Sequence, residues 1–244
     1  MNWFESWFDS PYYHLLYADR SQEEADAFIK NIYRFLQIQS TDTILDLACG
    51  AGRHSLALAQ KGNKILGIDL SQNSINQAKE ESQKLHITTV DFQTADMRNF
   101  ALNITFDYVL NLFTSFGYFQ SKSDNQKVAD QICQHQNKNG ITVIDYLNSA
   151  KVKANGESRT VKTVEGIQFN LHKFIEQDWV YKNIQFHVDG QDYQFREQVQ
   201  LFEKGEIENY FHNAGYITQN HFGNYNLDPY TKESDRSILV FIKQ

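Results

Sequence analysis

One short segment places an acid and two glycines at the end of an apolar run: Asp46-Leu47-Ala48-Cys49-Gly50-Ala51-Gly52. Glycines permit a sharp turn and let a bound molecule approach the backbone closely. A helix is expected directly after Gly52, and the first turn of a helix offers backbone N–H groups that lack intrahelical partners. A second acid, Asp69, ends the next apolar run, where its carboxylate can accept hydrogen bonds from both hydroxyls of a ribose. These residues predict a site for a cofactor that contains a nucleoside.

Two kinds of cofactor use this geometry. A dinucleotide site favours Gly-x-Gly-x-x-Gly, because pyrophosphate crosses the loop and the third glycine allows close packing; Ser55 stands at that third position here. S-adenosylmethionine has no phosphate to bind, and Asp46 is placed to meet its ammonium end. The pattern favours S-adenosylmethionine, while Asp46 could instead be only a hydrogen-bonded structural acid.

The elements around this segment alternate between strands and helices. Short apolar runs predict strands at 43–48, 64–69, 88–93, 106–110 and 141–145, with helices at 53–61, 71–85 and 123–136. Such runs are typical of parallel strands that are buried on both faces, and right-handed crossovers make the sheet doubly wound. We expect an α/β fold with a Rossmann-like, mostly parallel, seven-stranded sheet that closes with strands 216–222 and 237–243.

The pattern changes between residues 151 and 203. Alternating runs predict strands at 160–165, 167–175, 179–188 and 193–202, split by turn sequences such as Asp189-Gly190. We expect an inserted antiparallel sheet of three or four strands, which forms either a substrate cap or a dimer interface. The expected organisation is a helical lid at 1–40, a cofactor-binding α/β domain at 41–150 and 204–244, and the insertion at 151–203.

On these motifs the chain resembles the class I S-adenosylmethionine-dependent methyltransferases, in particular small-molecule enzymes with an inserted β cap. Their first motif, acid-x-x-x-Gly-x-Gly, corresponds to residues 46–52. The resemblance implies that Asp69 binds the ribose and that Asp96 contacts the adenine amine with Met97 packed on the ring. It implies a cofactor site formed by Asp46, Ala48, Gly50, Gly52, Asp69, Leu70, Asp96, Met97 and Asn111. The product would be S-adenosylhomocysteine.

Apolar residues near the start of the chain have helical spacing: Trp3, Phe4, Trp7 and Phe8. They predict a lid over the cofactor, a dimer contact or a membrane-surface helix. The last is disfavoured because residues 1–19 contain acids but no Lys or Arg. The resemblance favours a lid, from which Tyr17 and Arg20 would reach the cofactor and Arg20 would pair with its carboxylate.

Methyl transfer requires mainly positioning and desolvation, because the cofactor carries an activated methyl group. A general base helps if the nucleophile arrives protonated, and the candidates are Tyr12, Tyr13, His14, Tyr118 and Asp145. The expected reaction is methylation of an N, O or C nucleophile of a small molecule. Alternatives are a nicotinamide-dependent oxidoreductase and a non-catalytic S-adenosylmethionine-binding protein.

Composition and charge limit the expected partners, location and metal content of the protein. Lys and Arg number 23 and Asp and Glu 30, a net charge of −7, so no nucleic-acid partner is expected. The sequence has no apolar run of the ~18 residues that span a membrane, and its two cysteines suit a reducing compartment. The first residues have no positive n-region, so no signal peptide is expected. We expect a cytoplasmic monomer or homodimer without membrane association. The eight histidines lack metal-ligand spacing, so no metal is expected.

Overall fold

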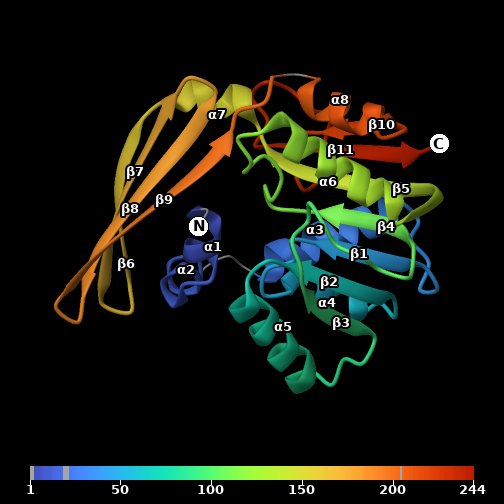
Figure 1. Ribbon diagram of the computed structural model, residues 1–244, viewed down its shortest axis with the longest axis horizontal. Coiled ribbons are helices and arrows are strands. Elements are labelled where there is room, and N and C mark those ends of the chain that lie inside the picture. Colours follow the sequence, from blue (N-terminus) through green and yellow to red (C-terminus); the bar gives the residue numbers. More distant parts are fainter. Residues whose placement is uncertain (1–2, 19–21, 204) are drawn as a thin grey trace.

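The computed structural model describes residues 3–18, 22–203 and 205–244, and it contains two sheets (Figure 1). The larger sheet has seven strands in the order β10-β11-β5-β4-β1-β2-β3. Its strands are β1 (Thr43–Leu47), β2 (Lys64–Asp69), β3 (Val90–Thr94), β4 (Phe106–Asn111), β5 (Gln136–Leu147), β10 (Tyr216–Phe222) and β11 (Arg236–Lys243). All neighbours are parallel except β11, which runs antiparallel to both β5 and β10. The predicted fold class is confirmed.

Helices cover both faces of this sheet. One face packs against α3 (Gln22–Phe35), α4 (Arg53–Ala59) and α5 (Gln72–Lys84) through a core that includes Phe28, Leu56 and Ile75. The other packs against α6 (Lys122–Gln134) and α8 (Glu206–Asn213), with Ile132 and Phe211 fully buried. Because β1 to β5 run parallel, their carboxyl ends lie at one edge of the sheet, and this edge is available for a ligand because the helices cover the two faces.

The second sheet is antiparallel and has four strands in sequential order: β6 (Ser158–Val164), β7 (Ile167–Glu176), β8 (Trp179–Val188) and β9 (Gln191–Gln200). Two short helices, α1 (Trp3–Phe8) and α2 (Pro11–Leu16), lie between it and the larger sheet (Figure 1). Trp7 and Leu16 pack with Phe169, Ile184 and Phe186 of the small sheet in a separate apolar cluster. The N-terminal helices therefore share a core with the insertion.

Two elements differ from the sequence-based expectation. Strand β5 begins at Gln136, so residues 136–140 belong to a strand, although their polarity had placed them in a helix end and turn. Helix α7 (Ser149–Asn155) was not predicted, because it has no buried residue and so no apolar periodicity. Its signal is local, since the Asn148 side chain accepts a hydrogen bond from the backbone N–H of Ala150 and caps the helix.

Within the described ranges, none of the helices is both long and apolar enough to pass through a membrane.

Candidate active site

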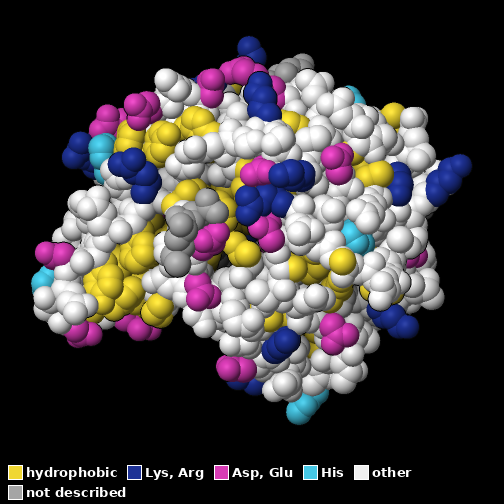
Figure 2. All heavy atoms as spheres, in the orientation of Figure 1, with side chains coloured by type: hydrophobic (Ala, Val, Ile, Leu, Met, Phe, Trp, Pro, Cys, Tyr) yellow, Lys and Arg dark blue, Asp and Glu magenta, His cyan; other side chains and the backbone are white. Residues whose placement is uncertain are grey.

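A cavity of about 800 Å³ lies between the carboxyl edge of the large sheet and the inserted sheet. The loops after β1, β2, β3 and β4 form one wall, and α1, α2, β8 and β9 form the other. Figure 2 shows hydrophobic side chains gathered over the inserted sheet beside the N-terminal helices, with acidic and basic side chains towards the middle of the face. The cavity is therefore a partly apolar enclosure with a few charged groups.

The predicted glycine loop forms the floor at one end. Ala48, Gly50 and Gly52 all have positive φ, and Ala48 and Gly50 line the cavity. A Cβ placed on Gly50 would meet no atom within 4 Å, so this backbone faces open space. A Cβ on Gly52 would lie 2.8 Å from the ring of Phe92, so Gly52 serves close packing beneath the loop. Gly50 thus leaves the backbone open to the cavity, whereas Gly52 allows the loop to pack closely on Phe92.

Asp69 lies at the end of β2 and faces the cavity, and Leu70 lines the cavity beside it. The Asp69 carboxylate accepts hydrogen bonds from the backbone N–H of Gly50, at 2.8 Å, and of Ser71, at 2.9 Å. Burial raises its pKa despite these hydrogen bonds. The same carboxylate therefore fixes the glycine loop and presents an acceptor to the cavity.

Asp46 lies beneath the loop, 1% exposed and not among the described residues that line the cavity. The Ser55 hydroxyl donates to it at 2.5 Å. Burial raises the pKa of Asp46 to about 6, and the nearby Asp69 acts in the same direction. The carboxyl group therefore changes its protonation state around pH 6.

Asp96 and Met97 both line the cavity after β3. Arg98 binds Asp96 through its guanidinium, with Nε 3.0 Å from Oδ1, and through its backbone N–H at 2.8 Å. Burial alone would raise the pKa of Asp96, but the hydrogen bonds from Arg98 lower it below its usual value. Asp96 therefore presents an ionised acceptor.

Besides Asp46 and Gly52, three more predicted site residues are not among the described residues that line the cavity. Asn111 is fully buried, and its side-chain amide donates to the Leu47 carbonyl at 2.9 Å, which ties β4 to β1. Tyr12 packs on Phe186 of the inserted sheet, with ring centroids 4.7 Å apart. Asp145, the third, forms a buried ion pair with Arg236. Arg20 lies outside the described residues.

The ion pair makes Asp145 a poor candidate for the general base. Its Oδ1 lies 2.7 Å from Nε of Arg236, and its Oδ2 accepts hydrogen bonds from the Phe113 N–H and the Tyr225 hydroxyl. The carboxylate is 1% exposed and is absent from the described cavity wall. Arg236, by contrast, lines the cavity and also donates to the Thr114 hydroxyl at 2.9 Å. Asp145 therefore fixes an arginine whose importance sequence reasoning had not found.

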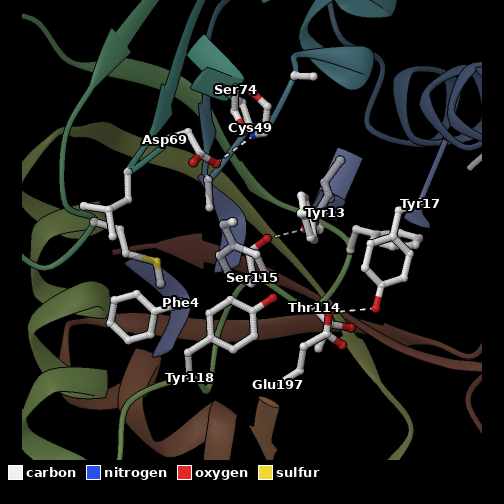
Figure 3. Close-up of a pocket in the computed structure, with 18 of the residues that line it drawn as sticks. Phe4, Tyr13, Tyr17, Cys49, Asp69, Ser74, Thr114, Ser115, Tyr118 and Glu197 are labelled. Carbon is white, nitrogen blue, oxygen red and sulfur yellow. Dashed lines mark hydrogen bonds between the residues drawn. The ribbon is translucent and has the colours of Figure 1, made fainter. Parts of the chain in front are cut away.

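The remaining acid–base candidates, Tyr13, His14 and Tyr118, line the cavity, as does Tyr17. Figure 3 shows Asp69 and Glu197 at opposite ends of the cavity, with Tyr17 beside Glu197. Nε2 of His14 is 3.5 Å from the hydroxyl of Ser74 at the start of α5. The cavity thus has an acidic end at the glycine loop and a second polar end under the inserted sheet.

The second polar end contains Lys182 on β8 and Glu197 on β9, which sequence reasoning missed. The two residues are direct partners in the strand register. Alternation along β9 places Phe195, Glu197 and Val199 on one face of the sheet. An acid on an otherwise apolar face was the signal that would have identified Glu197.

Comparison with known proteins identifies the family. A family model described as "Methyltransferase domain" matches residues 38–215, and the chain belongs to this family. It is an S-adenosylmethionine-dependent methyltransferase, so the predicted enzyme class and cofactor are confirmed.

Two curated relatives illustrate the similarity. A cypemycin N-terminal methyltransferase from a Streptomyces species is 26% identical over 207 residues, which is 83% of either chain. The dTDP-3-amino-3,4,6-trideoxy-alpha-D-glucopyranose N,N-dimethyltransferase of Streptomyces venezuelae is 24% identical over 135 residues, which is 54% of either chain. The chain thus spans most of the first relative and about half of the second.

Solved structures share the whole fold. An S-adenosylmethionine-dependent methyltransferase from Clostridium acetobutylicum has a TM-score of 0.82 at 20% identity, covering 95% of this chain and 96% of that one. CalS10, an amino pentose methyltransferase from Micromonospora echinaspora solved with S-adenosylmethionine, has a TM-score of 0.72 at 18% identity, covering 96% and 98%. The correspondence includes the inserted sheet, since so little of either chain is left uncovered.

Proposed function

We propose that this enzyme methylates an amine nitrogen of a small molecule that is enclosed between the two sheets. The observation that carries the proposal is the two-ended cavity: Asp69 and the open backbone at Gly50 lie at one end, and Glu197 under the inserted sheet lies at the other. A volume of about 800 Å³ suits a cofactor together with a small acceptor. The names of the relatives supply the atom type, since they act on an N-terminal amine and on an amino sugar.

The residues at the acidic end fit S-adenosylmethionine. Asp69 would accept hydrogen bonds from the ribose hydroxyls, and the exposed backbone at Gly50 leaves room for the methionine portion. Asp96 would accept a hydrogen bond from the adenine amine while Met97 packs against the ring. The cofactor supplies an activated methyl group.

The protein positions the acceptor and excludes water. Transfer requires the acceptor nitrogen to lose a proton and to approach the methyl carbon at roughly 3 Å. The aromatic wall would exclude water from that encounter; it comprises Trp3, Phe4, Phe8, Tyr13, Tyr118 and Phe119. We propose that α1 and α2 act as the lid of this site, and that Tyr13, His14 and Tyr118 are the groups close enough to hold or remove the proton.

Calorimetric titration with S-adenosylmethionine tests the cofactor site. Asp69→Ala removes the acceptor at the cavity, and we expect affinity to fall about 10-fold or more. Asp91→Ala is the matched control, because Asp91 is an exposed acid on the adjacent strand β3. Equal affinity in wild type and Asp69→Ala would refute the assigned cofactor position. Thermal melting of both variants checks that the loop held by Asp69 remains folded.

A screen of small amines, alcohols and thiols with detection of S-adenosylhomocysteine tests the acceptor class. We expect turnover with primary or secondary amines and none with the matched alcohols. Turnover of alcohols alone would contradict N-methylation while leaving the methyltransferase assignment intact. Light scattering on the purified protein distinguishes a monomer from a homodimer. We also propose a cytoplasmic location, which fractionation of native cells would test.

A further inference from the structure

A short chain of hydrogen bonds joins the lid to the inserted sheet inside the cavity. Oε1 of Glu197 accepts from the indole N–H of Trp7 and from the Tyr17 hydroxyl, both at 2.7 Å. Nζ of Lys182 donates to the Tyr17 hydroxyl at 2.6 Å and lies 3.4 Å from Oε2 of Glu197. Figure 3 shows the Tyr17–Glu197 contact at the edge of the cavity. Two strands, α1 and the residue that directly follows α2 therefore meet at one carboxylate.

The two oxygens of Glu197 have different environments. Oε1 already has two donors, which fill its lone-pair directions. Oε2 has, within the described ranges, only the longer contact with Lys182. The Glu197 side chain is 18% exposed and lines the cavity, and Oε2 is the oxygen that has acceptor capacity left for a bound molecule.

Lys182 supplies a donor beside that acceptor. An ammonium group has three N–H donors, and its shortest contact, at Tyr17, uses one of them. Its side chain is 28% exposed and also lines the cavity. Glu197 and Lys182 are opposite each other across β8 and β9, so their functional groups form a fixed donor–acceptor pair.

The charge of this pair indicates what it binds. Glu197 and Lys182 together are neutral, and burying a lone additional charge beside them would be costly. A neutral hydroxyl can donate to Oε2 and accept from Nζ at the same time, so it satisfies both groups without adding charge. The donors at Oε1 hold the carboxylate in place before any ligand enters, which lowers the entropy cost of binding.

We propose that Glu197 and Lys182 bind a hydroxyl group of the acceptor, and that the enzyme is therefore selective for hydroxylated amines over simple alkylamines. This inference rests on the proposed amine methylation. It assigns the inserted sheet the role of selecting the acceptor, while the glycine loop holds the cofactor at the opposite end. The reacting amine lies between them, and the bound hydroxyl fixes its distance from the methyl group.

Two probes of matched size test this proposal: trans-2-aminocyclohexanol and cyclohexylamine. We expect kcat/KM to be about 10- to 100-fold higher for the amino alcohol, the range that a hydrogen bond to charged groups supplies. Glu197→Gln keeps an oxygen for Trp7 and Tyr17 but replaces the free acceptor with a donor. Lys182→Met keeps the length of the side chain without its charge.

Both variants should lose the preference for the amino alcohol, which is measured within each variant as the ratio of kcat/KM for the amino alcohol to kcat/KM for cyclohexylamine and should fall to about one. Glu176→Gln is the control, because Glu176 is an exposed acid at the end of β7. Affinity for S-adenosylmethionine should be unchanged in all three variants. A wild-type enzyme without the preference, or a preference that survives in Glu197→Gln, would overturn the proposal.

A further measurement separates this inference from the proposed function. If no amine is methylated although S-adenosylmethionine binds, the proposed acceptor class is wrong. Saturation-transfer NMR with trans-cyclohexane-1,2-diol then examines the hydroxyl site directly. Binding to wild type that is lost in Glu197→Gln supports the site, and the absence of binding to wild type refutes it.

Discussion

We expect the affinity for S-adenosylmethionine to depend on the ionisation of Asp46. This carboxyl group lies directly under the glycine loop, and its burial raises its pKa to about 6. S-adenosylmethionine carries a net positive charge, so it should bind far better above a carboxylate than above a neutral acid. Binding should therefore release a proton when the free protein holds one.

The magnitude follows from the pKa. If only the ionised form binds, the dissociation constant is multiplied by 1 + 10^(pKa − pH), which is about 11 at pH 5 and about 1 at pH 8. Asp46→Asn removes the charge at every pH. This variant should bind S-adenosylmethionine about 10-fold or more weakly at pH 8, with no further loss on going to pH 5.

Calorimetry at pH 5, 6 and 8 gives these constants, with circular dichroism at each pH to confirm that the protein is folded. Buffers of different ionisation enthalpy report the protons released. The control is Asp91→Asn, an exposed acid on β3, which should behave as wild type. A wild-type constant that is equal at pH 5 and pH 8 would refute the reasoning. An unchanged pH dependence in Asp46→Asn would assign the effect to another acid.

Three further predictions concern stability. The raised pKa of Asp46 means that the native state holds this proton more tightly than the unfolded chain does, so stability is lost as pH rises through about 6. Asp46→Asn should therefore increase the free energy of urea unfolding at pH 8 by up to about 3 kcal/mol. Burial lowers the pKa of His54 to about 3, so stability should be lost as pH falls below about 6.5, and His54→Gln should reduce that slope in unfolding titrations. Asp145→Asn leaves the mostly buried Arg236 without its charged partner and should cost about 3–5 kcal/mol in the same urea assay. A loss under about 1 kcal/mol would show that the pair is solvated.

The sequence was sufficient to predict most of the large sheet because β1, β2 and β4 are short, mostly apolar runs whose strands are buried. Strands 216–222 and 179–188 were placed with the bounds that the structure has. The start of β5 was misplaced because its first residues are polar. Gln136 is 2% exposed, and its side-chain oxygen accepts a hydrogen bond from the Thr142 hydroxyl. This hydrogen bond allows a polar residue to occupy a core position.

The cofactor end of the site was predictable for a related reason. Its groups follow consecutive strands of one sheet, so a local motif determines both the loop and its position at the carboxyl edge. Ala48, Gly50, Asp69, Asp96 and Met97 all line the cavity as the motifs implied. Whether they bind the cofactor in the expected roles stays a prediction for the titrations above.

The acceptor end depends on contacts between distant segments, which no local pattern encodes. Tyr17 and Glu197 are 180 residues apart, and Asp145 and Arg236 are 91 apart, yet each pair forms a direct hydrogen bond. From the sequence alone, Asp145 was a candidate base, because the sequence does not show that it pairs with Arg236 on β11. A charged residue on an alternating strand is more informative when its apolar neighbours are considered, because an acid on an apolar face must have a donor or a ligand. At Glu197 the donors satisfy one oxygen, and the other remains for the acceptor molecule.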